Sequence, residues 1–114
     1  MDRAEMTERT KQFVLRILKL CRALPNDPEG RVIRSQLIRC GSPVGANYRA
    51  ALRARSKDEF RAKLGIVEEV ADEACFWLEI IVEDQMLPAT KVEALLQEAN
   101  EIVAIVVTTI RNSR

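Results

Sequence analysis

The chain has 114 residues and a formal net charge of +1, with 47% hydrophobic and 31% charged residues. This length and composition are typical of one globular domain over residues 1–114 and argue against a disordered chain. No stretch of 18 apolar residues is free of charge, which excludes a transmembrane helix, and the four glycines and four prolines favour a few long helices over many strands.

A first helix is predicted from about residue 7 to residue 24. Phe13, Ile17, Cys21 and Leu24 recur at helical spacing and would form its buried face. The segment Pro25-Asn-Asp-Pro-Glu-Gly30 follows, and its two prolines and its glycine predict a loop.

A second helix is predicted over residues 30–55. Its apolar stripe keeps its phase across Gly41-Ser42-Pro43, which favours a kink near Pro43 within one helix; two shorter helices are the alternative. Asn47 falls on this stripe, with Tyr48 at its edge. A buried amide needs partners, so we expect Asn47 to be a structural polar core residue that binds carbonyls near Pro43 or fixes helix register.

The opposite face of the second helix carries small or apolar residues where charge is usual, namely Ile38, Ser42, Gly45 and Ala46. Small residues let a second backbone approach closely, which predicts an interface. The alternative is that glycine is simply tolerated near a kink.

The third helix is predicted over residues 56–86, because Ser56-Lys-Asp-Glu59 has the pattern of a capping box. Its predicted core stripe consists of Phe60, Leu64, Val67, Ala71, Ala74 and Leu78. Ile66, Val70 and Trp77 widen its apolar face beyond this stripe. Phe76 lies almost opposite that stripe, beside glutamates, and should be exposed in a monomer.

The fourth helix is predicted over residues 90–112, opened by a second capping box at Thr90-Lys-Val-Glu93. One broad apolar face is predicted from Val92, Leu95, Leu96, Ala99, Val103, Val106 and Ile110, and the apolar surface is spread further by Ile102, Ile105 and Val107. The four amphipathic helices predict an all-α, antiparallel up-down-up-down four-helix bundle. Their excess of apolar surface predicts self-association, with an interface drawn from Ile38, Ser42, Gly45, Ala46, Ile66, Val70, Phe76, Trp77 and Ile105.

Charge is segregated along the chain. Residues 31–63 hold nine basic and two acidic side chains, whereas residues 64–101 hold one basic and ten acidic ones. The basic residues could contact the phosphates of RNA or DNA, or pair with Glu68, Glu69, Asp72, Glu73 and Glu79 within or between subunits. The candidate nucleic-acid contacts are Arg31, Arg49, Arg53, Arg55, Lys57, Arg61 and Lys63.

Nothing in the sequence points to catalysis. It has no histidine, no phosphate-binding glycine loop and no nucleophile-elbow serine, so we expect no enzyme, no cofactor, no metal and no small-molecule substrate. Cys21, Cys40 and Cys75 lie among apolar residues and are interpreted as reduced core residues. The charged N-terminal segment is unlike a secretion signal, and we expect a cytoplasmic protein that does not enter the membrane.

The residues from Gln36-Leu-Ile-Arg39 through Ser42-Pro-Val-Gly-Ala-Asn47 to Ser56-Lys-Asp-Glu-Phe60 resemble a known pattern. It is that of the bacterial four-helix-bundle family encoded in intervening sequences of 23S ribosomal RNA. One departure is clear: where members often carry Asn-Ile-Ala-Glu-Gly, this chain continues from Asn47 with Tyr48 and a run containing arginines.

This family also resembles the accessory variability determinant of diversity-generating retroelements, a basic homopentameric bundle that works with a reverse transcriptase and nucleic acid. The resemblance therefore implies a homo-oligomer, a pentamer in first place, without an established enzymatic activity. Two functions follow. The first is a self-associating structural or interaction module, and the alternative is a nucleic-acid-associated adaptor that uses the Arg/Lys cluster at residues 49–63.

Overall fold

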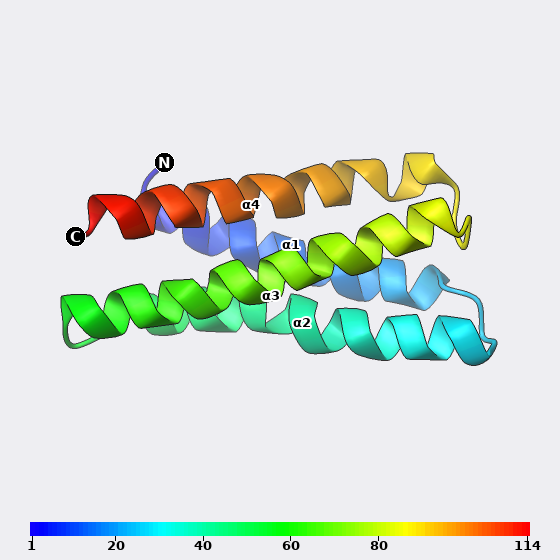
Figure 1. Cartoon of the computed structure of the whole chain (residues 1–114), viewed down its shortest axis with the longest axis horizontal. Helices are drawn as coiled ribbons and strands as arrows, with labels where there is room; N and C mark the ends of the chain where they lie inside the picture. The colour runs from blue at the N-terminus through cyan, green and yellow to red at the C-terminus, as the bar shows by residue number, and fades with distance from the viewer.

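The computed structural model describes residues 1–114, and four α-helices and one 3-10 turn account for most of them. The elements are α1 (Arg3–Ala23), α2 (Pro28–Leu52), α3 (Lys57–Glu83), η1 (Ala89–Lys91) and α4 (Glu93–Asn112). The helices run up, down, up and down in an elongated bundle of 45 × 21 × 19 Å (Figure 1). The predicted all-α fold class and antiparallel order are confirmed.

The helices form a ring of neighbours around one core. α1 packs on α2, α2 on α3 and α3 on α4, and a smaller contact between α4 and α1 completes the ring. α1 and α3 therefore lie diagonally opposite each other, and Figure 1 shows α1 behind α3. Both chain termini lie at the end of the bundle that holds the α2–α3 turn (Figure 1).

Three of the helices start at a polar side chain that accepts a hydrogen bond from a backbone N–H of the first turn. The predicted cap at Ser56 is confirmed, with 3.0 Å between its Oγ and the nitrogen of Glu59. Asp2 and Asp27 cap α1 and α2 in the same way, so these helices begin a few residues earlier than predicted. In a capping box, the glutamate side chain accepts from the N–H of the N-cap residue, here Ser56. The side chain of Glu59 instead accepts from the N–H of Arg55, the residue before Ser56.

The helix α2 continues through Pro43, as the phase of its apolar stripe predicts. The two-helix alternative is wrong. Ser42 donates its hydroxyl to the carbonyl of Ile38 at 2.7 Å, one turn earlier on the helix. The helix ends at Leu52 and not at residue 55 as predicted, because the chain must turn before the cap at Ser56.

The start of α4 was predicted wrongly. Thr90 is exposed and makes no capping bond, and the 3-10 turn Ala89–Lys91 precedes the helix. Val92 stands at the N-cap position with its side chain fully buried. The start of α4 is therefore set by the burial of Val92 in the core and not by a cap at Thr90.

The buried apolar residues form one core to which all four helices contribute. The predicted faces of α1 and α3 are confirmed: Phe13, Ile17, Leu64 and Leu78 are fully buried. In α4, Ile102 lies in the core, whereas sequence spacing placed it outside the main stripe. No helix combines the length and the apolar character that crossing a membrane would need.

Two glycines let α1 and α2 approach closely. A Cβ atom on Gly41 would lie 2.9 Å from Cγ2 of Ile17, and one on Gly45 would lie 3.2 Å from Cγ2 of Val14. Distances this short leave no room for a side chain unless the neighbours shift. The small residues of α2 thus serve packing within the chain.

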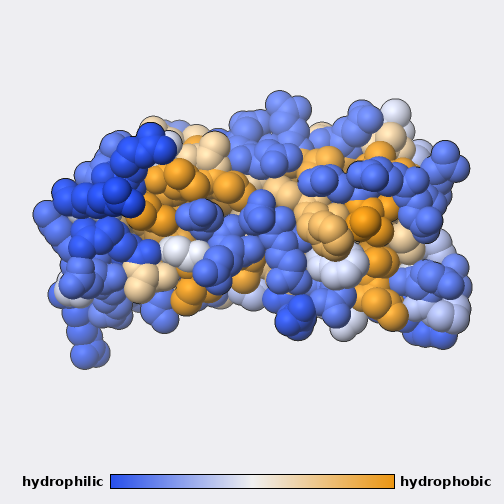
Figure 2. All heavy atoms as spheres, viewed as in Figure 1, coloured by the Kyte–Doolittle hydropathy of each residue, from blue (hydrophilic) through white to orange (hydrophobic).

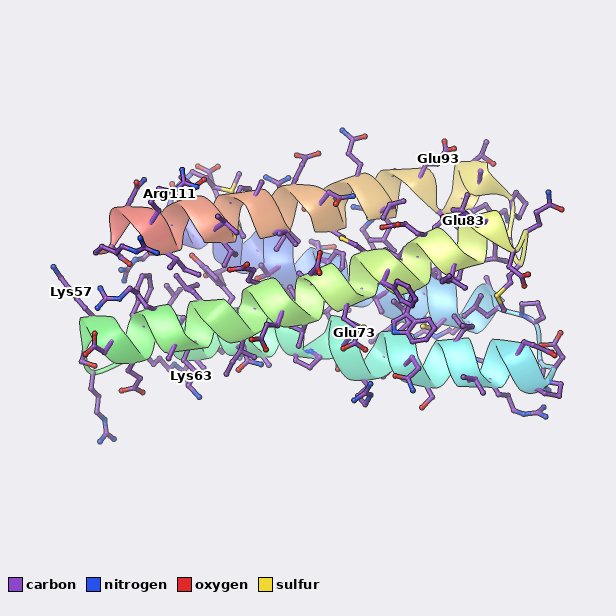
Figure 3. The ribbon with its side chains drawn as sticks, in the orientation of Figure 1. Lys57, Lys63, Glu73, Glu83, Glu93 and Arg111 are labelled. Atoms are coloured by element: carbon purple, nitrogen blue, oxygen red, sulfur yellow. The ribbon has the colours of Figure 1, made fainter.

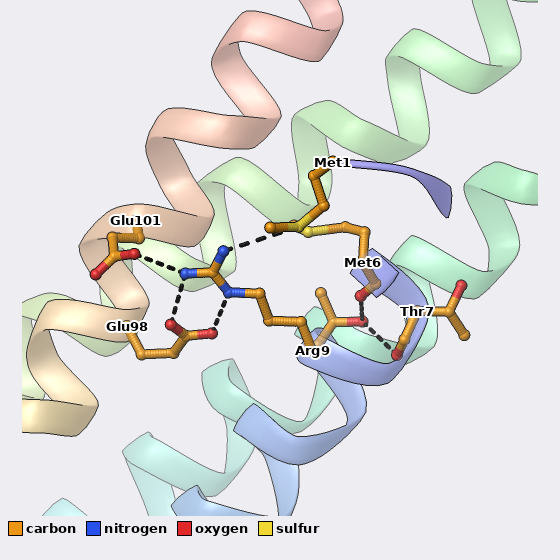
Figure 4. Close-up of polar contacts among 7 residues, drawn as sticks. Met1, Met6, Thr7, Arg9, Glu98 and Glu101 are labelled. Carbon is orange, nitrogen blue, oxygen red and sulfur yellow. Dashed lines mark hydrogen bonds and ion pairs between the residues drawn. The ribbon is translucent and has the colours of Figure 1, made fainter. Parts of the chain in front are cut away.

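Two arginines that the sequence analysis did not single out fasten α1 to its neighbours. Arg34 on α2 donates to the backbone carbonyls of Cys21 and Leu24, both at 3.1 Å. These carbonyls lie at the C-terminal end of α1, where helical partners are missing. Arg9 on α1 binds Glu98 of α4 through two nitrogens, at 2.6 and 2.7 Å, and also Glu101 at 2.7 Å (Figure 4).

Candidate functional site

The predicted basic residues do not form one patch. Arg31 lies in the first turns of α2, and 18 residues of helix, about 27 Å, separate it from Arg49. The other members lie in the half of the bundle that holds the α2–α3 turn. Arg49, Arg53, Arg55 and Lys57 are exposed there, whereas Arg61 and Lys63 are partly buried.

Almost none of these cations has an ionic partner within the chain. Arg61 is the exception, bound to Asp58 and to the carbonyl of Ser113. The prediction that they pair with the acidic third helix is therefore wrong within one chain. The single ion pair between α2 and that acidic stretch joins Glu73 to Arg39, at 3.3 Å, and Arg39 was not among the candidates.

The basic half of the molecule ends in an open hollow of about 440 Å³. Its lining includes Arg3, Arg55, Lys57 and Arg114 and no acidic side chain. Figure 2 shows strongly hydrophilic residues gathered at this end. Figure 3 places Lys57, Lys63 and Arg111 in this half of the bundle and Glu83 and Glu93 at the other end.

The predicted interface residues divide into two groups. Ile38, Val70, Trp77 and Ile105 are partly buried against the core of their own chain. These four residues therefore offer less free surface than the sequence analysis expected. Ser42 and Gly45 are partly buried as well, and the residues that remain exposed are Ile66, Phe76 and Ala46.

The small-residue patch of α2 borders a shallow groove between α1 and α2, with a volume of about 360 Å³. Ser42, Gly45 and Ala46 form one side of it, and Val14 and Leu15 of α1 form the other. Leu15 is 49% exposed there, which is unusual for so large an apolar side chain. The rim adds Thr7, Lys11 and Arg49, so the charge of the lining is entirely positive.

The exposed aromatic ring lies on another helix. Phe76 on α3 is 52% exposed, as predicted, and its ring meets that of Trp77 edge to face, with centroids 4.9 Å apart. The indole N–H of Trp77 donates to Glu73 at 3.2 Å, which fixes the indole. Phe76 is therefore held in place on the surface of a rigid helix.

The prediction for Asn47 needs a correction. Its side chain is only partly buried, and the neighbouring Tyr48 takes the core position with 6% of its surface exposed. An aromatic ring gains more from burial than an amide does, so the stripe shifts by one residue. The amide nitrogen of Asn47 does bind a carbonyl near Pro43, that of Pro43 itself, at 3.1 Å.

Comparison with known proteins identifies the family. The model of the family described as 23S rRNA-intervening sequence protein matches residues 2–108. The chain belongs to this family.

A solved structure has the same fold. The family member resembles a crystal structure at 1.70 Å of a protein of unknown function, described as from the S23 ribosomal protein family, from Bacteroides thetaiotaomicron VPI-5482. The two share 28% sequence identity and a TM-score of 0.89, over 97% of this chain and 99% of that one. No curated protein matches the chain.

The thiols of this intervening-sequence protein are buried and protonated, and therefore unreactive. Cys21, Cys40 and Cys75 are free and buried, as predicted. Burial raises the pKa of Cys21 and of Cys75 to about 11 and that of Cys40 to about 12. They are therefore neutral at physiological pH, whereas a nucleophile or metal ligand must be a thiolate.

The sequence analysis missed three surface or linking features of this family member. Leu15 and Val32 are exposed apolar residues, and both fall outside the apolar stripes that periodicity selects. The contact of Arg9 with α4 joins residues 89 positions apart, and no local pattern signals it. The groove beside Leu15 had one signal in the sequence. Gly41 and Gly45 are four residues apart, which places both on the same face of a helix.

Proposed function

We propose that the chain is a non-enzymatic, self-associating helical bundle that serves as a structural or interaction module. The observation that carries this proposal is Phe76, a large aromatic side chain held half-exposed on the surface of a helix. Phenylalanine, like tyrosine and tryptophan, buries a large apolar area and contributes strongly to the energy of interfaces. Its contact with Trp77 limits the motion of the ring, so little conformational entropy is lost when a partner covers it.

The chemistry of the chain supports a role without catalysis. It contains no histidine, and its thiols are buried and neutral at physiological pH. The reduced state of three cysteines suits a cytoplasmic location. As a ring-shaped homo-oligomer, with a pentamer in first place by the resemblance drawn from the sequence, the module would present each of its surfaces several times.

Sedimentation velocity on purified wild-type protein and Phe76→Ala tests this proposal. The wild type should sediment as a defined oligomer, and Phe76→Ala should weaken its association by about thirtyfold or more, the equivalent of a loss of about 2 kcal/mol. Val32→Ala is the matched control, because Val32 is 56% exposed, apolar and on another part of the surface. A wild-type protein that sediments as a monomer at all concentrations would contradict the proposal.

The basic end of the bundle supports a second candidate function, the nucleic-acid-associated adaptor. Arg53, Arg55 and Lys57 are exposed without ionic partners, next to a hollow that Arg3 and Arg114 also line. Guanidinium groups bind phosphate oxygens through two parallel hydrogen bonds. The guanidinium of Arg3 is partly engaged already, 5.3 Å from the ring centre of Phe60.

Titration of labelled RNA and DNA at several salt concentrations tests this second candidate. Phosphate contacts predict an affinity that falls steeply as salt rises, with a slope reduced when Arg53 and Arg55 are changed to glutamine. Arg31→Gln is the control, since Arg31 lies at the opposite end. Absence of binding at low salt would remove the adaptor function and leave the self-association proposal intact.

A further inference from the structure

Two surfaces of the chain carry opposite charges, and each exposes apolar side chains. The groove between α1 and α2 is concave and apolar along its floor, and Lys11 and Arg49 stand on its rim. Neither cation forms an ion pair within the chain. Glu8, one helical turn before Lys11, accepts a hydrogen bond from Gln12 instead. The groove thus presents apolar surface edged with unpaired positive charge.

The surface around Phe76 has the opposite properties. The aromatic ring projects from α3, and Asp72 and Glu79 lie one helical turn before and after it. Both carboxylates are exposed and unpaired, whereas Glu73 is engaged by Arg39 and Trp77. Figure 3 shows Glu73 on the side of α3 that faces α2.

We propose that Phe76 of one copy packs into the α1–α2 groove of a second copy, with Asp72 and Glu79 facing Lys11 and Arg49. This inference rests on the proposed self-association and names the surfaces that carry it. The occupant of the groove is a second copy because the same chain carries a ring that fits an apolar groove and carboxylates that match its cations. Burying the ring would remove Leu15 and Phe76, two of the most exposed large apolar side chains, from water together.

The position of the two surfaces determines the kind of assembly. The groove lies on α1 and α2, and Phe76 lies on α3, diagonally opposite α1. A contact between two different surfaces of the same chain is heterologous. Such contacts form a closed ring when the rotation between copies closes and a filament when it does not, whereas a two-fold dimer would need the groove and Phe76 on the same face of the bundle. The defined, soluble particle expected here is therefore a ring of three or more copies.

Charge reversal on one or both surfaces tests the contact. Lys11→Glu/Arg49→Glu places four carboxylates at the contact, and Asp72→Lys/Glu79→Lys places four cations there. Each double variant should weaken association by about tenfold or more, because like charges then face each other. The quadruple variant carries both reversals in every copy, restores opposite charges and should assemble again.

A control separates this contact from a general effect of charge. Arg22→Glu/Arg31→Glu changes the net charge as much as the groove variant does, at exposed positions of the opposite end, and should leave assembly unchanged. Circular dichroism confirms that each variant is folded. An assembling wild type whose association survives both double variants would overturn this contact and leave the proposed self-association standing. A monomeric wild type would overturn both.

Cysteine pairing tests the heterologous geometry directly. One chain carries Ala46→Cys in the groove and another carries Glu79→Cys beside Phe76, and the two are mixed under mild oxidation. The native thiols are buried and should not react. A disulfide that joins the two different chains is expected. Disulfides that form only between identical variants would indicate a two-fold contact and overturn the proposal.

Discussion

The first hairpin, α1–α2, and the second, α3–α4, use their small and large residues differently. In the first, Gly41 and Gly45 bring the helices close together and leave a shallow groove with a positive rim. In the second, Phe76 and Ile66 are exposed on a helix that carries eight of the 17 acidic residues. In the proposed contact, the small residues of the first hairpin line the groove, and Phe76 of the second hairpin fills it.

The two hairpins also differ in the contacts that stabilise them. The first hairpin relies on specific contacts, the close approach at its glycines and the bonds of Arg34 to the end of α1. The glycine of α3, Gly65, has no such role, because a Cβ atom there would meet nothing within 4 Å. Substitutions of the same chemical kind should therefore have opposite or unequal effects in the two hairpins.

The largest effect is expected from Arg34→Met. The substitution removes charge-assisted hydrogen bonds to the carbonyls of Cys21 and Leu24, and the carbonyl of Cys21 then keeps only the backbone N–H of Leu24, at 3.3 Å. The free energy of unfolding, measured in urea, should fall by about 2 kcal/mol. Arg31→Met, at an exposed position one turn earlier, should change it by no more than about 0.5 kcal/mol. Equal effects of the two variants would show that Arg34 does not hold the first hairpin together.

A smaller effect is expected from Gly41→Ala, which should lower the free energy of unfolding by about 1 kcal/mol. The new methyl group would lie 2.9 Å from Ile17, a fully buried side chain with little freedom to move. Gly65→Ala, the matched change in α3, should raise the same free energy by about 0.5–1 kcal/mol, because alanine favours the helix and nothing obstructs it.

The double variant Gly41→Ala/Ile17→Leu sharpens this test. Leucine lacks the branch at Cβ that the new methyl group would meet, so the two changes together should cost less than the sum of the two alone. Strict additivity would mean that the approach of α1 to α2 does not depend on this contact.

The smallest effect near neutral pH concerns the thiols. The pKa of Cys21, Cys40 and Cys75 is raised above the value of 9.0 that an unfolded chain would show. The folded state therefore keeps protons that the unfolded state loses, so stability is unaffected below about pH 9 and falls as the pH rises toward 11. Thermal melts from pH 7 to pH 11 measure the fall, and the triple Cys→Ser variant should show less of it.

Local patterns were sufficient to predict most of the fold. The stripes of α1 and α3 and the cap at Ser56 were predicted because they depend on residues within one or two helical turns. The continuity of α2 through Pro43 followed from the phase of its apolar residues in the same way.

The errors arose where packing decided the outcome. Burial of Val92 replaced the expected cap at Thr90, and burial of Tyr48 displaced Asn47 from the core. The candidate surfaces depended even more on contacts between distant residues. The sequence singled out Phe76, but the groove beside Leu15 exists only because two helices meet there. Arg31 was grouped with a cluster that lies at the other end of its helix.

Light scattering of the wild-type protein over a hundredfold range of concentration tests the central claim, self-association through two different surfaces, most directly. A single mass of at least three chains, unchanged across the range, is the predicted result. A mass of one chain at every concentration would contradict self-association, and a stable mass of two chains would contradict the contact between different surfaces.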